Sequence, residues 1–84
     1  MNWMAEVDQV GSREELAAFV QLLADECAAR SDEWENRSLD RFLAALAAWI
    51  HDMEGYYLNQ GVQPPDTPSW KTFAEMLTAA RIYE

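Results

Sequence analysis

The sequence predicts an all-α fold, a compact bundle of three main helices preceded by an N-terminal arm or a short extra helix. Apolar residues recur at helical spacing in three segments, alanine fills much of the space between them, and good capping residues precede each segment. The chain has 84 residues, which suffices for one core. Residues 1–84 are therefore expected to form a single helical domain.

The first helix is expected over residues 13–30. Ser12 and Glu15 have the spacing of a capping box, in which two side chains satisfy backbone N–H groups at a helix start. The apolar stripe that follows consists of Leu16, Phe19, Val20, Leu23 and Cys27. Because Cys27 belongs to this stripe, its thiol is expected to be buried and unreactive.

The second helix is expected to begin after Ser38, a good N-cap residue. Gly55 is one possible end, but Tyr57 continues the apolar pattern, so the helix is expected to reach Tyr57 with Gly61 as its limit. The predicted buried face consists of Leu39, Phe42, Leu43, Leu46, Trp49, Ile50 and Met53. Trp49 lies in the middle of this face and is expected to be the centre of the core.

Trp34 lies among acidic residues in the connection between these two helices. A hydrophobic residue shortly before a helix start can pack against its first turns. The Trp34 ring is therefore expected to lie inward, against one of three side chains: Leu39, Phe42 or Leu43. Asn36 is expected to bond backbone groups of its own turn. The alternative is an exposed Trp34 that contacts a partner.

The third helix follows a Pro-rich connection, Gln63-Pro64-Pro65-Asp66, which cannot continue a helix. Thr67 then has the character of an N-cap with Pro68 at the first helical position. The expected inner face consists of Trp70, Phe73, Ala74, Leu77 and Ala80. Residues 1–11 have no decisive period, which leaves the arm and the short helix as alternatives.

The chain is strongly acidic, with fifteen acidic and six basic residues and a net charge of −9. Nucleic acids and anionic membranes are bound through Lys and Arg, so neither is an expected partner. The charge has two interpretations, solubility alone or a negative face that steers a basic protein partner. One cysteine, no long apolar run and no basic start of a signal peptide predict a cytoplasmic protein.

No motif in the chain indicates catalysis or a bound cofactor. His51 and Glu54 are helical neighbours, but two ligands fall far short of a metal site. A non-enzyme without cofactors or metal is therefore expected, and a small enzyme or metal binder that uses His51 is the weakest alternative.

The Tyr56-Tyr57 pair suggests an interface, because adjacent helical positions diverge by about 100°. With Tyr57 inward, Tyr56 is expected to be partly exposed in an acidic setting, and exposed tyrosine is common at interfaces. The candidate partner-binding residues are Glu33, Glu35, Asp52, Glu54 and Tyr56.

Two resemblances accompany these patterns. Trp34-Glu35-Asn36, the apolar spacing from Leu39 to Trp49-Ile50, and the later Pro68-Ser69-Trp70 resemble a small bacterial domain family of unknown function over most of the chain. Tyr56-Tyr57, Gly61 and Asp66-Thr67-Pro68 resemble a motif of the nuclease-colicin immunity proteins. Those are acidic helical proteins that block a basic nuclease toxin, although the short helix that carries their tyrosine pair has no clear counterpart here.

The expected function is that of a non-enzymatic acidic protein-interaction domain. Its narrower form, implied by the second resemblance, is an immunity- or antitoxin-like inhibitor of a basic partner. The alternative is a structural homo-oligomer whose surplus aromatic residues are buried against a second copy.

Overall fold

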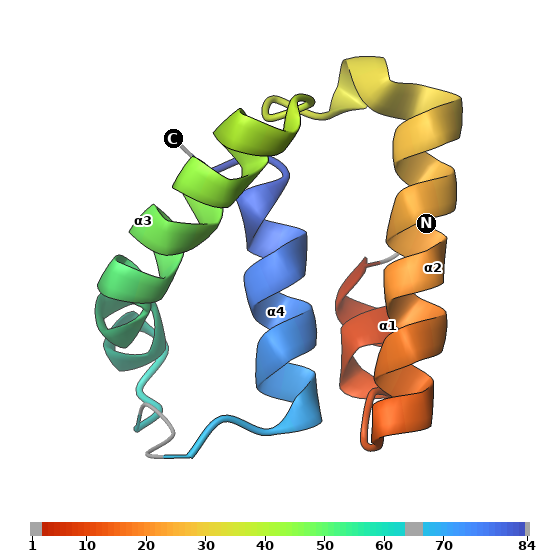
Figure 1. Ribbon diagram of the computed structural model, residues 1–84. Coiled ribbons are helices and arrows are strands. Elements are labelled where there is room, and N and C mark those ends of the chain that lie inside the picture. Colours follow the sequence, from red (N-terminus) through yellow and green to blue (C-terminus); the bar gives the residue numbers. More distant parts are fainter. Residues whose placement is uncertain (1–2, 64–66, 84) are drawn as a thin grey trace.

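The computed structural model describes residues 3–63 and 67–83. These residues form helices and turns without a strand, which confirms the all-α class. The elements in chain order are α1 (Trp3–Asp8), α2 (Arg13–Arg30), the 3-10 turn η1 (Ser31–Glu33), α3 (Leu39–Asn59) and α4 (Trp70–Ala80). α4 lies in the middle of the bundle, with α3 on one side and α1 and α2 on the other (Figure 1).

The N-terminal segment is the short extra helix rather than an extended arm. α1 packs on α2, where the Trp3 ring meets the Phe19 ring edge-on at a centroid distance of 5.8 Å. Val7 and Val10 are buried beside Phe19 in the main core cluster. α1 is thus a part of the bundle. Its apolar side chains cover apolar surface of α2 that would otherwise be exposed to water.

α2 begins and ends where the sequence predicts, and Ser12 caps it. The Ser12 hydroxyl accepts a hydrogen bond from the Glu15 backbone N–H at 3.1 Å. The return bond differs from the prediction, because the Glu15 carboxylate accepts from the Gly11 N–H at 3.1 Å instead of from Ser12. Both bonds still satisfy donors at the helix start, which is the stabilising effect of the capping box.

The predicted stripe of α2 is buried only in part. Phe19 and Leu23 are buried, whereas Val20 is exposed because α1 and α4 contact the face that Phe19 and Leu23 share. The predicted full burial of Cys27 is wrong, since its thiol is half-buried. Cys27 lies in the last turn of α2 and packs at the edge of the core cluster rather than inside it.

α3 runs through Gly55 to Asn59, as the prediction of a helix that includes the tyrosine pair requires. Gly61 ends it with a φ of 71°, in the left-handed region that glycine adopts without strain. The Gly61 N–H bonds to the Leu58 carbonyl and the Val62 N–H to the Tyr57 carbonyl, each at 3.0 Å. These two bonds form a Schellman motif, which satisfies the last carbonyls of the helix.

The predicted buried face of α3 is rotated relative to the observed one. Leu39, Leu43 and Ile50 are exposed and Ala45 is buried, whereas Tyr57 is buried as predicted. The reason is that α3 packs against α4 along one face, and none of the described helices covers its outer face (Figure 1). Trp49 is buried as predicted but lies outside the main core cluster, so it is not the centre of the core.

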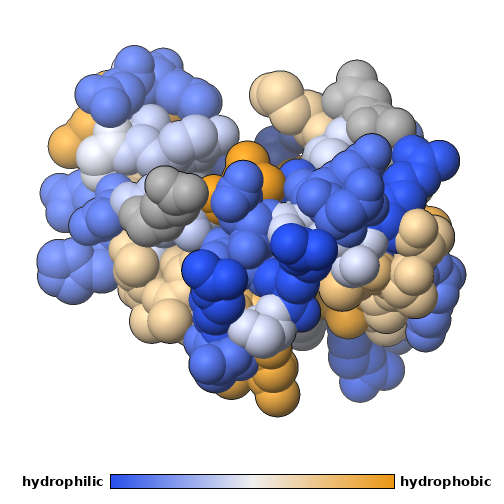
Figure 2. Space-filling model, turned by 90° about the horizontal axis from the view of Figure 1, so that it is seen from above, coloured by the Kyte–Doolittle hydropathy of each residue, from blue (hydrophilic) through white to orange (hydrophobic). Residues whose placement is uncertain are grey.

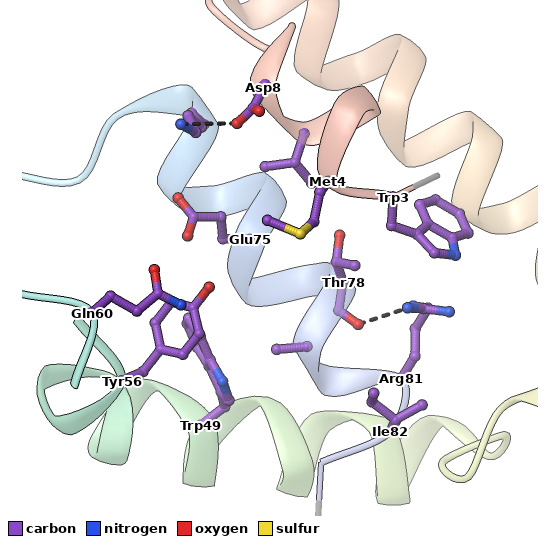
Figure 3. A pocket seen from close by; sticks show the side chains of 13 residues that line it. Trp3, Met4, Asp8, Trp49, Tyr56, Gln60, Glu75, Thr78, Arg81 and Ile82 are labelled. Carbon is purple, nitrogen blue, oxygen red and sulfur yellow. Dashed lines mark hydrogen bonds and ion pairs between the residues drawn. The ribbon is translucent and has the colours of Figure 1, made fainter. Parts of the chain in front are cut away.

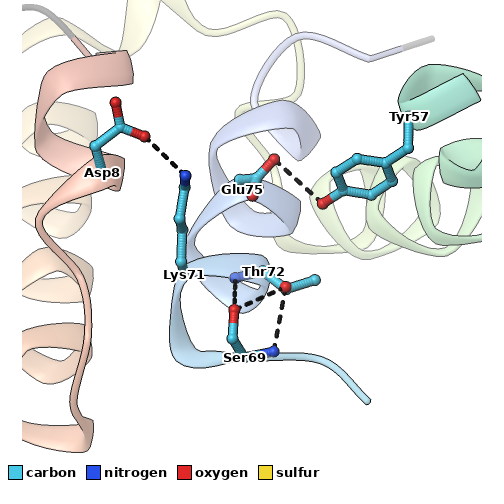
Figure 4. A network of polar contacts seen from close by, with 6 residues as sticks. All are labelled: Asp8, Tyr57, Ser69, Lys71, Thr72 and Glu75. Atoms are coloured by element: carbon cyan, nitrogen blue, oxygen red, sulfur yellow. Dashed lines mark hydrogen bonds and ion pairs between the residues drawn. The ribbon is translucent and has the colours of Figure 1, made fainter. Parts of the chain in front are cut away.

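α4 begins at Trp70, with Ser69 as its N-cap in place of the predicted Thr67. The Ser69 hydroxyl accepts from the Thr72 N–H at 3.1 Å, and the Thr72 hydroxyl accepts from the Ser69 N–H at 3.2 Å (Figure 4). This reciprocal pair is a capping box, which stabilises a start at Trp70 more than an uncapped start at Pro68. The predicted interruption at Pro64–Asp66 lies outside the described residues.

The prediction of the inner face of α4 is correct for its alanines and wrong for its two aromatic residues. Ala74 and Ala80 are 0% exposed, whereas Trp70 and Phe73 are 42% and 41% exposed. Alanine at these positions leaves room for neighbouring helices to approach the α4 backbone closely. The large rings of Trp70 and Phe73 instead contact each other at the surface, with a centroid distance of 6.3 Å.

Candidate functional site

A cleft of about 270 Å³ opens between α1 and α3, and α4 forms its floor (Figure 3). Its walls carry aromatic rings from both helices, and its floor carries charged side chains from α4. The main lining residues are Trp3, Asp8, Trp49, Tyr56, Lys71, Glu75 and Arg81. The two sides of this cleft differ in chemistry.

The α1 side of the cleft holds two cations. The Arg81 guanidinium carbon lies 4.6 Å from the Trp3 ring centroid and 5.8 Å from that of Trp34. The Arg81 Nε also donates to the Thr78 carbonyl at 2.9 Å. Burial lowers the pKa of Arg81 from its ordinary value, but a guanidinium stays charged in proteins. Arg81 is therefore a cation held over the Trp3 ring and, at a greater distance, over the Trp34 ring.

Lys71 is also held by the α1 side. Its Nζ pairs with the Asp8 carboxylate at 3.0 Å, which links α4 to α1 (Figure 4). This hydrogen bond and the charge of Asp8 raise the pKa of Lys71. The pair is exposed enough for water to screen it, so it orients Lys71 more than it stabilises the fold.

The α3 side of the cleft combines aromatic rings with a carboxylate. The Trp49 and Tyr56 rings lie 5.6 Å apart between centroids. Glu75 is half-buried on the floor and accepts a hydrogen bond from the Tyr57 hydroxyl at 3.2 Å (Figure 4). The Glu75 carboxylate forms no salt bridge within residues 3–63 and 67–83, where the ion pairs are all between other residues.

Tyr57 links α3 to this carboxylate, and its ionisation is expected to lower the stability of the fold at alkaline pH. Burial, followed by the charge of Glu75, raises the pKa of Tyr57 to about 12 from 10.0. The folded state therefore keeps its proton in a range where the unfolded state loses it. The stabilisation is complete below pH 10 and is expected to fall as pH rises from about 10 to about 12.

The check is a pair of urea unfolding series between pH 9 and 12, on the wild-type chain and on Tyr57→Phe. The difference in unfolding free energy between the two is expected to shrink as pH rises, because only the wild type has this titration. Every other ionisable group is present in both chains, so its contribution cancels in the difference. A difference that stays constant over this pH range would contradict the raised pKa.

The predicted partner-binding residues do not form one site. Glu33 and Glu35 lie at η1 and just after it, at the end of the molecule where α2 leads into α3. Asp52, Glu54 and Tyr56 lie in the second half of α3, towards the opposite end (Figure 1). Of the five, Tyr56 alone lines the cleft.

Asp52 has hydrogen-bond partners on its carboxylate, whereas the two loop residues Glu33 and Glu35 lie in a different part of the surface. The Asp52 carboxylate accepts from the Tyr83 hydroxyl and contacts the His51 ring nitrogen. These bonds, that of Tyr83 first, lower the pKa of Asp52. Glu33 and Glu35 are exposed, and the molecule seen from their end is mostly hydrophilic, with hydrophobic atoms in scattered patches (Figure 2).

Trp34 has the predicted inward position. It is buried, and its ring stacks on the Phe42 ring at a centroid distance of 6.0 Å, while Leu39 and Leu43 point to solvent. Its indole N–H is buried without a hydrogen-bond partner. The anchor interpretation of Trp34 is therefore confirmed, with Phe42 as the neighbour.

The prediction for Asn36 is wrong, because this residue bonds the end of α4 rather than its own turn. Its side-chain Nδ2 donates to the carbonyls of Ala80 at 2.9 Å and Tyr83 at 2.8 Å. Its backbone N–H donates to the Arg81 carbonyl at 3.0 Å. Asn36 thereby caps α4 from a distant loop and holds the segment that places Arg81 in the cleft.

Trp3, Glu75 and Arg81 are cleft residues that the sequence predictions missed. One signal was present: Lys71, Glu75 and Thr78 share a face of the third helix at i, i+4 and i+7. A polar stripe on a helix that is buried on its other faces indicates an open groove along that stripe. Trp3 had no such signal, since residues 1–11 have no clear period.

The structure provides no metal centre or membrane span in the part of the chain it describes. No three His, Cys, Asp or Glu side chains in residues 3–63 and 67–83 are grouped so as to hold a metal ion. None of the helices in these ranges combines the length and the apolar character needed to cross a bilayer.

The comparisons with known proteins identify a family but no activity. One family model matches residues 12–84, and its description is a family of unknown function (DUF7660). No curated protein and no solved structure matches the chain. The matched range includes α2, α3 and α4, and so it includes the α3 side and the floor of the cleft.

Proposed function

The chain belongs to DUF7660, a family of unknown function, and from that premise we propose that it is a non-enzymatic domain that binds a basic protein partner. The single observation that carries the proposal is the open cleft, which is lined by aromatic rings and lies in a chain with a net charge of −9. Exposed aromatic side chains provide contact area at interfaces. A strongly negative surface steers basic partners during association.

The narrower form of this proposal is an immunity- or antitoxin-like inhibitor in the bacterial cytoplasm. Its support is the acidic charge and the resemblance of the Tyr56-Tyr57 region to the immunity proteins. Tyr56 is 38% exposed at the rim of the cleft, where a partner can reach it. An inhibitor of this kind would cover the functional surface of a basic toxin with its own acidic one.

A second candidate function is self-association through α3. Leu39, Leu43 and Ile50 are exposed on one face of this helix, at spacings of four and seven residues. An apolar stripe of this kind suits a second copy of the chain. It lies on the outer face of α3, whereas the cleft lies on the side towards α1.

Salt dependence distinguishes the two candidates. Products of the neighbouring genes are tested for binding to the full chain, and the oligomeric state of the chain alone is measured by sedimentation. A basic binder whose affinity falls about tenfold or more between 0.05 and 0.3 M salt is expected, because ions screen steering charges. A stable dimer that persists at high salt, with no salt-sensitive binder, would favour self-association instead.

A further inference from the structure

We propose that the α3 side of the cleft is a receptor for an arginine side chain of the partner. The inference rests on the proposed function, because it assigns a site to the basic partner. It is defined by four residues, Trp49, Tyr56, Gln60 and Glu75. Figure 3 shows the side chains of Tyr56, Gln60 and Glu75 on the same side of the cleft, opposite Trp3 and Arg81.

The cations that line the cleft leave this side open. Lys71 is turned to Asp8, and Arg81 is stacked on Trp3 and bonded to the Thr78 carbonyl. Both cations have their direct partners on the α1 side, and the Lys71 charge also acts on Glu75 across the floor of the cleft without pairing with it. The α3 side is left with a half-buried carboxylate, Glu75, that forms no salt bridge with any residue the structure describes.

The groups that remain have the chemistry that recognises a guanidinium. A carboxylate can accept two parallel N–H bonds from the planar fork of arginine. An aromatic ring attracts the same cation through its face, and Tyr56 is 38% exposed beside Trp49. Gln60 is exposed at the rim, where its amide oxygen can accept a further N–H.

The same groups disfavour other occupants. An anion would meet the Glu75 charge in a chain that is already at −9. A purely apolar side chain would cover the Glu75 charge and add no hydrogen bond to the one from Tyr57, which costs free energy. Lysine would satisfy the charge, but its compact ammonium neither stacks as a plane nor donates in a fork. Arginine is the side chain that satisfies both the ring and the carboxylate.

The test is an NMR titration of the full chain with a hexa-arginine peptide at 0.05 M salt. The wild type is expected to bind, with the largest shifts at the side chains of Trp49 and Tyr56. Glu75→Gln is expected to weaken binding about fivefold, since one charge-assisted bond is lost. Glu14→Gln removes the same charge from an exposed site on α2 outside the cleft and is expected to change the affinity less than about twofold.

Two further measurements test whether binding depends on the Glu75 carboxylate itself or on the groups around it. Tyr57→Phe removes the hydrogen bond to Glu75 but leaves its charge, so binding should persist. Hexa-lysine is expected to bind the wild type more weakly than hexa-arginine, and the two peptides should bind Glu75→Gln more equally.

The possible outcomes distinguish the inference from the function it rests on. Equal weakening by Glu75→Gln and Glu14→Gln would overturn the arginine site, because binding would then depend on net charge alone, and the proposed basic partner would stand. If the wild type did not bind hexa-arginine at low salt, both the site and the steering by acidic charge would be rejected.

Discussion

Replacement of Trp34 by alanine is expected to lower the free energy of unfolding by about 3–5 kcal/mol, the range for a buried tryptophan. The Trp34 ring is 6% exposed, stacks on Phe42 and lies under the Arg81 guanidinium. The change therefore opens a cavity where the start of α3 meets the end of α4. A small domain has about 5–15 kcal/mol in total, so the variant is expected to be close to unfolding at room temperature.

Urea unfolding followed by circular dichroism measures this effect, with two controls. The double variant Glu33→Gln/Glu35→Gln alters exposed neighbours of Trp34 and is expected to stay within about 0.5 kcal/mol of the wild type. Trp34→Phe keeps a ring on Phe42 and loses no hydrogen bond, because the indole N–H has none. It is expected to retain most of the stability. An unchanged midpoint for Trp34→Ala would show that the anchor interpretation is wrong.

Replacement of Asn36 by alanine is expected to cost about 2–3 kcal/mol, because it removes both side-chain hydrogen bonds to the end of α4. The carbonyls of Ala80 and Tyr83 then lose their donor in a partly buried setting. The segment after α4 is expected to loosen, so the Ile82 and Tyr83 amides, which bond to the Ala79 carbonyl, should exchange with solvent faster.

Urea unfolding and hydrogen exchange together test this capping role. Asn59→Ala is the matched control, since Asn59 is exposed at the last position of α3 and should change stability by less than about 0.5 kcal/mol. Loss of stability in Asn36→Ala without faster exchange at Ile82 and Tyr83 would mean that the effect arises elsewhere in the fold. Faster exchange limited to this segment would support the cap.

Local sequence patterns predicted the helices well where a local interaction defines the boundary. Ser12 sits three residues before Glu15, and the predicted start of α2 is correct. Gly61 supplies a left-handed residue directly after α3, and the helix ends there. The start of α4 was placed too early because Thr67-Pro68 and Ser69 are both good starts, and only the reciprocal bond between Ser69 and Thr72 distinguishes them.

The candidate site was much harder to predict, because it depends on which helices meet. Tyr56 was recognised as an exposed aromatic residue, but its neighbours in the cleft come from α1 and α4. Glu75 carries no local sign of its pairing with Tyr57, which lies 18 residues earlier in the chain. The acidic residues at Glu33 and Asp52 look equivalent in the sequence, yet they lie towards different ends of the molecule.

Helical periodicity, capping and turn chemistry act over a few residues, so the class of the fold, the main helices and the inward position of Trp34 follow from the sequence alone. The buried face of α3, the partners of Asn36 and the position of the cleft became visible in the packed structure. These features depend on the packing of α4 between α3 and the pair α1 and α2. When a helix has two apolar stripes, the helix that packs against it determines which stripe is buried. The periodicity of one segment carries no information about that second helix.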